Sequence, residues 1–508
     1  MESTAKKEHV AALLKKGVLV SPDFVEQADA SIKPGEDLLI LDSEANKLLS
    51  KKEKNVNWRE IEKIRVMYEK GKASLPSIED IAPVSDENKL KDTQIIASYK
   101  TAPQKIDISH FVGYFNTRYR LIEGLLRGRP ELQNLLSVIR LKNRAVPSNA
   151  SIIGIVNEKR ETKNKNFIVT LEDSTGQQKV VINKNRADLY NEARELVTDE
   201  VVGVSGSYRQ GVMFANSIVF PDIPLLELKK SPKEEYLAGM SDLHFGSKQF
   251  MPDEFNRFLS WVNLEAGNRK QKEIAEKLKY ILIAGDIVDG IGVYNNQYSE
   301  LSIHDLKEQY DACAKALSEI PEHISIVISP GNHDAVRMPE PQPPLDNKFT
   351  QKLVKLKNVL LVSNPAMVKI GAKEGFSGFN CLLYHGYSFD YYVANVDAIR
   401  LKGGYERADL IMKFLLKRRH LAPSHTSTLI NPSPDHDALF IEPVPDFFIT
   451  GHIHRTSVSN YKSTTLINGS CWQSMTSFQE RLGHNPQPAR LPLINLKTRD
   501  ANIINFGK

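Results

Sequence analysis

The C-terminal part of the chain alternates short apolar runs with longer stretches of helical periodicity. The runs are rich in Ile, Val and Leu, as in YILIA and ISIVIS. Continuous apolar runs of this length are typical of strands buried on both faces, and intervening helices are typical of parallel connections. The pattern therefore predicts a layered α/β domain over residues 231–508.

A different pattern occupies residues 146–230, where short segments rich in β-branched residues are separated by polar turns. The segments are SIIGIV, NFIVTLED, KVVIN, EVVGVSGSY and MFANSIVF, with one helical insert, NRADLYNEARELV. Five short strands and one helix predict a barrel of the OB type. Such a barrel binds single-stranded nucleic acid or serves as a protein docking surface, and its few aromatic residues leave both readings open.

Residues 110–145 have the periodicity of a helical segment that packs one face on a core. Its apolar positions recur every three or four residues, at Phe111, Phe115, Tyr119, Ile122 and Leu126. Basic residues outnumber acidic ones here, which indicates either a solvated helix face or a phosphate-contacting surface. The basic residues are Arg118, Arg120, Arg127, Arg129, Arg140, Lys142 and Arg144.

The first part of the chain predicts little packed structure. Residues 1–65 read as a small helical module, since Val10, Leu13 and Leu14 have helical spacing. Residues 66–109 are rich in Pro, Ser, Lys, Asp and Glu, which predicts a linker.

Composition narrows the class of protein. The 508 residues include 41% hydrophobic and 25% charged residues, which is the balance of a folded, multidomain globular protein. No apolar run reaches the roughly 18 residues of a membrane span, and three scattered cysteines make neither a disulfide framework nor a zinc site. We therefore expect a cytoplasmic protein without a membrane partner. The net charge of +5 is compatible with nucleic acid but too small to demonstrate it.

Five of the apolar runs end directly in clusters of residues that bind metals. SDLH follows YLAGM, GDIVD follows YILIA, PGNHD follows ISIVIS, HGYS follows NCLLY, and GHIH follows DFFIT. In layered α/β folds, sites form beyond the carboxyl ends of the strands, so distant residues can converge there. By contrast, His420 and His425 follow no such run and are expected at the surface.

The clusters supply seven oxygen or nitrogen ligands and no thiolate. They are Asp242, His244, Asp286, Asn332, His385, His452 and His454. One zinc ion takes only about four ligands, so two divalent metals are implied, with Asp286 as the natural bridge. A mixed carboxylate, amide and imidazole shell suits Mn²⁺ best, with iron and zinc as alternatives.

The ordered set DLH, GDIVD, GNHD, HG and GHIH resembles the calcineurin-like metallophosphoesterase superfamily. The resemblance implies that superfamily's α/β sandwich, preceded here by the barrel. It also implies that Asp242, His244, Asp286 and His454 hold one metal, and that Asp286, Asn332, His385 and His452 hold the other. His333 and Asp334 are implied as catalytic, with His333 near the scissile phosphate and Asp334 orienting its imidazole.

The residues around these motifs indicate a particular branch. Protein phosphatases of this superfamily carry an arginine after the second aspartate of the GD motif and a glutamate after the Asn-His pair. Here Gly290 and Asp334 occupy these positions, which disfavours a protein phosphatase. The segments GNHDAVRMPEPQPPL, HFVGYFNTRYRLIEGLLRGRPEL and CWQSMTSFQERLGHNPQPARLPLINLKTR are similar to the small subunits of archaeal family D DNA polymerases.

That family resemblance implies a Mn²⁺-dependent 3′→5′ exonuclease that proofreads for a large catalytic polymerase subunit. The implied substrates are primer-template DNA and single-stranded 3′ ends, and a sliding clamp is left open as a further partner. Two alternatives remain, a catalytically silent scaffold subunit and a nuclease of the double-strand-break repair type. The complete ligand set argues against the first, and the barrel before the catalytic domain argues against the second.

Overall fold

The chain divides into two compact units, residues 1–83 and 84–508. The computed structural model describes residues 19–20, 55–56, 90, 92–100, 105–144, 148–481 and 483–507. In the first unit, the described residues form a parallel pair of short strands, β1 (Leu19–Val20) and β2 (Asn55–Val56). The rest of the helical module predicted for residues 1–65 lies outside the described residues.

Five strands close into a barrel in the order β4-β5-β6-β8-β7, as the sequence predicts. The strands are β4 (Ser148–Glu161), β5 (Phe167–Asp173), β6 (Gly176–Ile182), β7 (Val201–Arg209) and β8 (Val212–Val219). Helix α7 (Ala187–Arg194) lies between β6 and β7. Alternate apolar residues such as Ile152, Val169 and Val204 fill the interior.

Helix α5 (Ile108–Arg127) precedes the barrel and is followed by α6 (Val138–Lys142). Asp107 caps α5 by accepting a hydrogen bond from the Ser109 amide at 2.8 Å. Of the apolar face predicted for this helix, Ile122 and Leu126 are buried and the aromatic members are half-buried.

Arg118 on α5 is the exception in the basic segment, because its side chain is fully buried and belongs neither to a solvated face nor to a phosphate-contacting surface. Its guanidinium donates to the Pro423 carbonyl at 2.8 Å and to the Tyr114 hydroxyl at 2.6 Å, and it lies 3.3 Å from Asp437. His420, predicted at the surface, is also buried and contacts Asp437 at 2.8 Å. The surface prediction for His420 is wrong because Asp437, its partner, is separated from it in sequence and gives no local signal.

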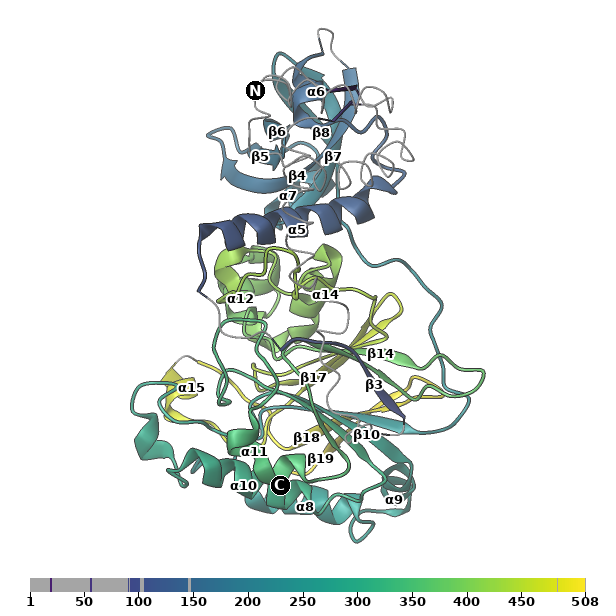
Figure 1. Ribbon diagram of the computed structural model, residues 1–508, viewed down its shortest axis with the longest axis vertical. Coiled ribbons are helices and arrows are strands. Elements are labelled where there is room, and N and C mark those ends of the chain that lie inside the picture. Colours follow the sequence, from purple (N-terminus) through teal and green to yellow (C-terminus); the bar gives the residue numbers. More distant parts are fainter. Residues whose placement is uncertain are drawn as a thin grey trace, which may run out of the picture. The chain divides into compact units, whose positions relative to one another are not determined.

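Two six-stranded sheets form the α/β domain (Figure 1). The first has the order β12-β11-β10-β9-β18-β19, and the second has the order β16-β17-β15-β14-β13-β3. The first comprises β9 (Tyr236–Met240), β10 (Leu278–Ala284), β11 (Ser325–Ser329), β12 (Val359–Leu361), β18 (Arg490–Asn495) and β19 (Ala501–Asn505). The second comprises β3 (Thr93–Ser98), β13 (Ala366–Ile370), β14 (Phe379–Leu383), β15 (Phe447–Thr450), β16 (Thr456–Tyr461) and β17 (Thr464–Gly469).

Strand β3 corrects the linker prediction for residues 66–109 over residues 93–98, whereas residues 66–89 of that predicted linker lie outside the described residues. It pairs antiparallel with β13 at the edge of the second sheet, with Ser98 opposite Ala366 and Thr93 opposite Ile370. A backbone that is paired in this way satisfies its hydrogen bonds through a remote strand, which composition alone does not reveal.

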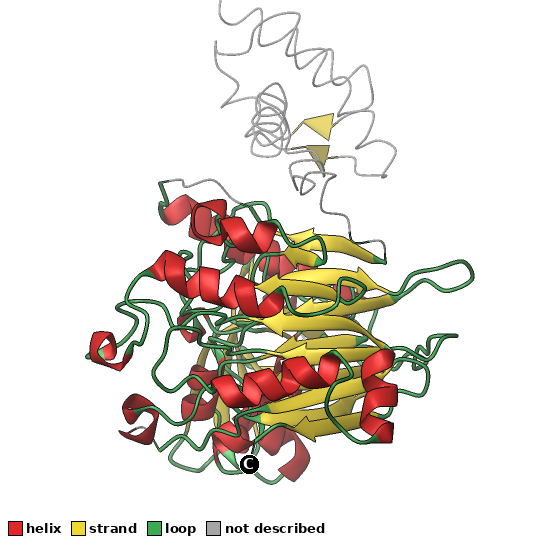
Figure 2. Cartoon of the chain, turned by 90° about the horizontal axis from the view of Figure 1, so that it is seen from below, coloured by secondary structure: helices red, strands yellow, loops and turns green. Residues whose placement is uncertain are grey.

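Apolar side chains fill the space between the two sheets. Helices pack on the outer face of each sheet (Figure 1), and Figure 2 shows helices in front of the strands on the side seen there. Leu282, Val327 and Ile449 belong to the core between the sheets. Cores against the first sheet include residues of α8 (Pro252–Val262), α9 (Arg269–Glu276), α10 (Leu306–Leu317) and α11 (Asn347–Val354). Those against the second include residues of α12 (Phe389–Asn395), α13 (Asp397–Arg400) and α14 (Ala408–Arg418).

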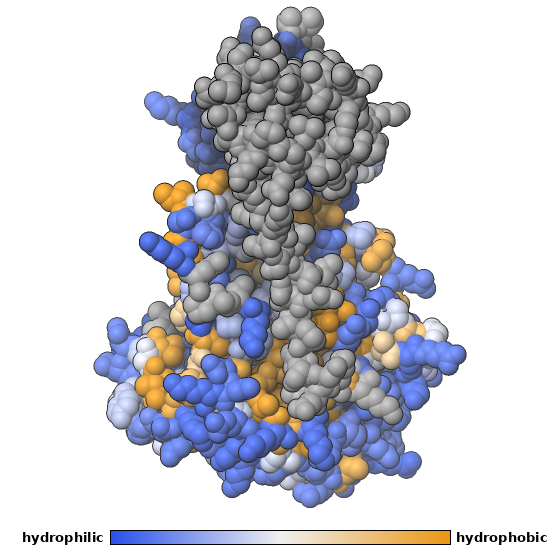
Figure 3. All heavy atoms as spheres, in the orientation of Figure 1, coloured by the Kyte–Doolittle hydropathy of each residue, from blue (hydrophilic) through white to orange (hydrophobic). Residues whose placement is uncertain are grey.

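Shorter elements complete the domain. They are the single-turn helices η3 (Gln297–Glu300), η4 (Gly404–Glu406) and η5 (His425–Ser427), and helix α15 (Ser477–Arg481). On the face seen in Figure 3, hydrophilic side chains cover most of the rim of the α/β domain. Among the helices described, none has both the length and the apolar character that crossing a membrane requires.

Buried contacts join the barrel to the α/β domain. The Arg418 guanidinium lies 2.7 Å from the Glu200 carboxylate, and both side chains are about 1% exposed. The same guanidinium is 5.0 Å from the centre of the Phe220 ring, which also faces Lys417. Because a buried ion pair is costly to separate, these contacts oppose hinge motion between the two domains.

Candidate metal centre

The five metal-type clusters meet at one edge of the two sheets. Strands β9, β10 and β11 are parallel neighbours, as are β14 and β15, so their carboxyl ends point the same way. Asp242 and His244 follow β9, Asp286 follows β10, Asn332 follows β11, His385 follows β14, and His452 and His454 follow β15. The structure brings all seven predicted ligands together.

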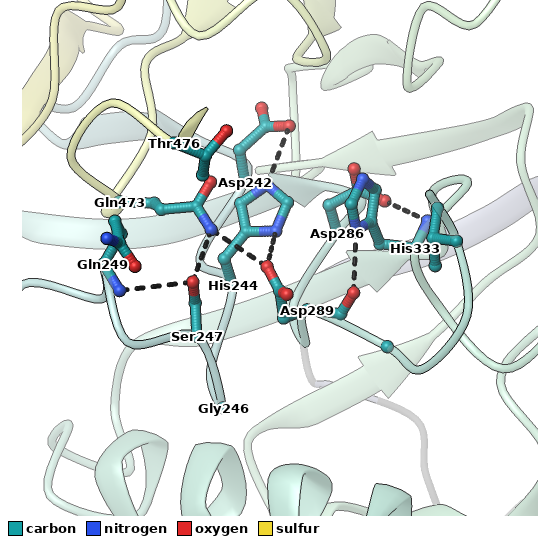
Figure 4. Close-up of polar contacts among 12 residues, drawn as sticks. Asp242, His244, Gly246, Ser247, Gln249, Asp286, Asp289, His333, Gln473 and Thr476 are labelled. Atoms are coloured by element: carbon teal, nitrogen blue, oxygen red, sulfur yellow. Dashed lines mark hydrogen bonds and ion pairs between the residues drawn. The ribbon is translucent and has the colours of Figure 1, made fainter. Parts of the chain in front are cut away.

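One group of ligands surrounds Asp242. The Nε2 atoms of His244 and His454 face each other at 3.1 Å. The Oδ1 atom of Asp242 lies 3.4 Å from His454 Nε2. It lies 3.9 Å from His244 Nε2 (Figure 4). All three side chains are buried.

The second group surrounds Asn332. Its Oδ1 atom lies 2.9 Å from His385 Nε2 and 3.1 Å from His452 Nδ1. His385 Nε2 is also 3.2 Å from Asp286 Oδ2. Asp286 Oδ1 accepts a hydrogen bond from the His333 amide at 2.8 Å, which holds this carboxylate between the groups.

The outward nitrogen of each imidazole is held by a polar neighbour. His244 Nδ1 contacts Asp289 at 3.1 Å, His385 Nδ1 contacts the Ala284 carbonyl at 2.8 Å, His452 Nε2 contacts Asp390 at 3.1 Å, and His454 Nδ1 contacts the Gln479 amide at 2.9 Å. Outer partners of this kind fix the tautomer and the ring orientation of metal-binding histidines. The inward nitrogens therefore converge on the same small space.

The donor set fits a divalent cation on electrostatic grounds. Because His385 Nδ1 donates to the Ala284 carbonyl, its Nε2 lone pair faces the oxygens of Asn332 and Asp286, which are acceptors too. A shared cation satisfies all three. Without one, a proton on His385 does so: burial lowers its pKa, but Asp286 more than reverses this and raises it to about 10.

The carboxylates are ionised in this setting. Burial alone would raise the pKa of Asp242 and Asp286, but the neighbouring imidazoles of His454 and His385 respectively outweigh burial and lower both values. Both side chains are therefore charged at neutral pH, as a cation site requires.

The backbone is strained at five of the seven predicted ligands. Asp242, His244, Asp286, His452 and His454 have φ between +52° and +71°, the left-handed region that non-glycine residues rarely adopt. Such strain costs of the order of 1 kcal/mol or more per residue and clusters at functional sites. Its concentration at these positions supports a binding role.

Glycines beside the ligands permit close packing. A Cβ atom at Gly451 would lie 2.5 Å from the Asp242 Oδ2 atom, and one at Gly331 would overlap the Asp286 carboxylate. The glycines of GHIH and GNHD are therefore required by the approach of one ligand-bearing loop to another.

His333 and Asp334 lie at the site, but Asp334 does not orient the His333 ring. The His333 Nδ1 atom contacts the Asp289 carbonyl at 2.7 Å. Asp334 instead accepts hydrogen bonds from the amides of Asp286 at 2.9 Å and Gly331 at 2.8 Å. It joins two ligand-bearing loops, and burial, followed by the charge of Asp286, raises its pKa to about 7.

A cavity of about 300 Å³ lies over the ligands. Several of its lining residues are not predicted from the sequence: Asp289, Val293, Tyr294, Met338, Tyr387, Asp390, Tyr405, Gln473, Thr476, Gln479 and His484. Only Asp289, within GDIVD, carries a local signal. The others lie outside the five motifs, on loops or on short helices such as α12, η4 and α15, or, as with Tyr387, have the apolar character of a packing residue.

The barrel and the α/β domain match two different family models. Residues 237–459 match the family model of the B subunits of DNA polymerases alpha and epsilon, and residues 150–211 match the model of an OB-fold nucleic acid binding domain. The first match, which covers less than half of the chain, indicates the class of B-type subunits of DNA polymerases.

Whole-chain relatives identify the family within that class. The DNA polymerase II small subunit of Methanothermobacter thermautotrophicus is 38% identical over 389 residues, which cover 77% of this chain and 78% of the relative. Those of Pyrococcus furiosus and Archaeoglobus fulgidus are 38% identical over 408 and 385 residues, covering 79% and 76% of this chain. The chain belongs to the DNA polymerase II small subunit family. It spans 64% of the Pyrococcus furiosus protein and 75% of the Archaeoglobus fulgidus protein.

Proposed function

We propose that the chain is a 3′→5′ exonuclease that proofreads as the small subunit of a replicative DNA polymerase. The observation that carries the proposal is the convergence of seven carboxylate, amide and imidazole ligands over two sheets, beside His333. Family membership supports association with a large catalytic subunit. The OB-type barrel and the open side of the cavity support contact with primer-template DNA and single-stranded 3′ ends.

The two groups of predicted ligands would form two neighbouring metal sites. Asp242, His244, Asp286 and His454 would hold one ion, and Asp286, Asn332, His385 and His452 the other. Two divalent ions, best Mn²⁺ with iron and zinc as alternatives, would supply charge that stabilises the attacking and leaving oxygens of phosphodiester hydrolysis. The α/β sandwich of the metallophosphoesterase type is part of the same proposal.

The protein's own residues orient the reacting groups. His333 is anchored through Nδ1 to the Asp289 carbonyl at 2.7 Å, which directs its Nε2 atom away from that loop. In that position the imidazole can stabilise charge on the scissile phosphate or protonate the leaving oxygen. Asp289 also contacts His244 Nδ1 at 3.1 Å and accepts from Gln473 at 2.9 Å, so one carboxylate holds the ring of a ligand (Figure 4).

The bridge is tested by Asp286→Ala, which removes a ligand common to both groups. Hydrolysis of 3′-labelled single-stranded DNA in Mn²⁺ should fall to background, whereas Asp435→Ala, a change to an exposed aspartate, should leave it intact. Metal content measured on the purified variants should show two ions per wild-type chain and a loss in Asp286→Ala. A single ion in the wild type would refute the two-metal assignment.

A silent scaffold subunit is the second candidate, since the buried junction between barrel and sheets would serve that role as well. The complex with the large subunit separates the two readings on paired and mismatched primer ends. Proofreading predicts faster trimming of mismatched ends, because pairing costs a few kcal/mol per base to undo. Metal binding without cleavage would favour the scaffold, and purely internal cleavage would favour a repair-type nuclease.

A further inference from the structure

Two neighbouring rings that no part of the proposed chemistry uses line the cavity. The rings of Tyr405 and His484 lie 4.6 Å apart with their planes 34° from parallel. Both side chains are half-buried and both line the cavity. They differ in this from core aromatics such as Trp472, which is about 1% exposed.

The two segments that carry these rings are tied together beside a metal ligand. Arg455, which follows His454, donates to the Asn485 carbonyl at 2.7 Å. Its guanidinium also lies 3.7 Å from the Glu406 carboxylate. One arginine therefore holds the residues next to Tyr405 and His484 at the ligand loop, although these two rings are far apart in the sequence.

The hydroxyl group at the edge of the Tyr405 ring is hydrogen-bonded, and the rings of Tyr405 and His484 line the cavity. This hydroxyl donates a hydrogen bond to Asp390, which contacts His452 Nε2 at 3.1 Å. Burial lowers the pKa of His484, which keeps its ring neutral at neutral pH. A fixed tyrosine beside a neutral imidazole offers flat, apolar surface, which suits stacking on a nucleobase.

We propose that Tyr405 and His484 form a stacking platform for the base next to the scissile phosphate of a single DNA strand. The proposal rests on the proposed nuclease function and specifies how its substrate is held. A cavity of about 300 Å³ lies at the small end of ligand pockets, so it suits one unpaired nucleotide rather than a base pair. The platform would select frayed 3′ ends by rewarding a free base.

The first test compares two substrates of the full-length protein in Mn²⁺. Tyr405→Ala and His484→Ala should each raise KM for single-stranded DNA by roughly 5- to 100-fold, in line with base stacking on a protein ring. For an oligonucleotide whose 3′-terminal nucleotide lacks its base, and so has no ring to stack on the platform, the KM of each variant should stay within about twofold of wild type. Parallel loss on both substrates, or no change on either, would overturn the platform.

Tyr405→Phe separates stacking from support of the metal ligand. It keeps the ring and removes only the hydrogen bond to Asp390, so its KM for DNA should stay near wild type. If its KM rose as far as that of Tyr405→Ala, the residue would act through His452 instead. Tyr298→Ala is the matched control, because Tyr298 also lies 4.6 Å from a histidine ring, His304, but is 62% exposed and does not line the cavity.

A binding measurement distinguishes failure of the platform from failure of the nuclease function. In chelator, the fluorescence of 2-aminopurine at the 3′ end of a short oligonucleotide should be quenched by wild type and by Tyr298→Ala. With Tyr405→Ala or His484→Ala, the 2-aminopurine should remain fluorescent. Quenching without hydrolysis in Mn²⁺ would refute the nuclease function but support the stacking platform. Hydrolysis in Mn²⁺ without quenching would support the nuclease function but refute the platform.

Discussion

Residues at the strand ends must pack tightly against neighbouring loops. They must also direct their polar atoms into the predicted metal centre. Gly451 and Gly331 meet these demands by having no side chain where a ligand from another loop passes. Asp334 meets them by accepting amides from two loops. We therefore expect the geometry of the predicted metal centre to depend on these contacts as well as on the predicted ligands.

Gly451→Ala should damage the site without removing any ligand. The new methyl group would lie 2.5 Å from Asp242 Oδ2, so either the carboxylate or the loop has to move. We expect Mn²⁺ affinity to fall by about 10- to 100-fold, the usual cost of displacing a neighbour that orients a ligand. Titration calorimetry measures this. Gly124→Ala, where nothing lies within 4 Å of the new atom, is the control, and an equal fall there would contradict the packing argument.

His333→Ala should separate chemistry from metal binding. The ring is implied as an acid or a charge stabiliser and belongs to neither group of ligands. We therefore expect the rate of DNA hydrolysis to fall by roughly 10²- to 10⁴-fold with the metal content unchanged. Elemental analysis alongside kinetics checks this, and loss of metal in the variant would make His333 a ligand.

Glu340 should make the stability of the fold depend on pH. Its carboxyl is buried among Tyr384, Asn364 and Thr428, and burial raises its pKa to about 7. Between about pH 4.5 and pH 7 the folded state keeps a proton that the unfolded state releases. The free energy of unfolding should therefore fall as the pH rises from about 4.5 to about 7. The difference is at most about 3 kcal/mol.

Glu340→Gln imitates the protonated acid and should remove this part of the pH dependence. Urea unfolding of both proteins at intervals across that range measures the difference. A mutant curve parallel to that of the wild type would show that Glu340 does not titrate in the range.

At the scale of elements, the sequence predicts what local pattern encodes. The barrel strands, their helical insert and the strand ends that carry the ligands were all predictable, because strand length, turn residues and motif order are local signals. Strand β3 was not, because its only structural partner among the described strands is β13 and its flanking composition is polar. Arg118 and His420 were misread for the same reason, since both depend on Asp437.

The junction between α5 and the α/β domain gives a prediction at this scale. Asp437→Asn leaves the Arg118 guanidinium buried beside a neutral group, which costs about 3 to 5 kcal/mol for a pair of this kind. The melting temperature should therefore drop by several degrees. Asp409→Asn breaks the pair with Arg407, which is 47% exposed, and should change it little. Equal effects in the two variants would contradict the burial argument.

At the scale of the whole molecule, the site brings like-charged and strained groups together, so metal binding and stability should be coupled. Buried Asp242 and Asp286, five left-handed ligand positions and facing imidazole nitrogens all favour a state that holds cations. A ligand that binds only the folded protein stabilises it by about 2.7 kcal/mol at 100 times its Kd. Mn²⁺ should therefore raise the melting temperature by several degrees, and chelator should reverse this. Asp286→Asn should abolish most of the shift, whereas Asp435→Asn should keep it. A wild-type melting curve that is indifferent to Mn²⁺ would show that the converging side chains form a hydrogen-bonded network instead of a metal centre.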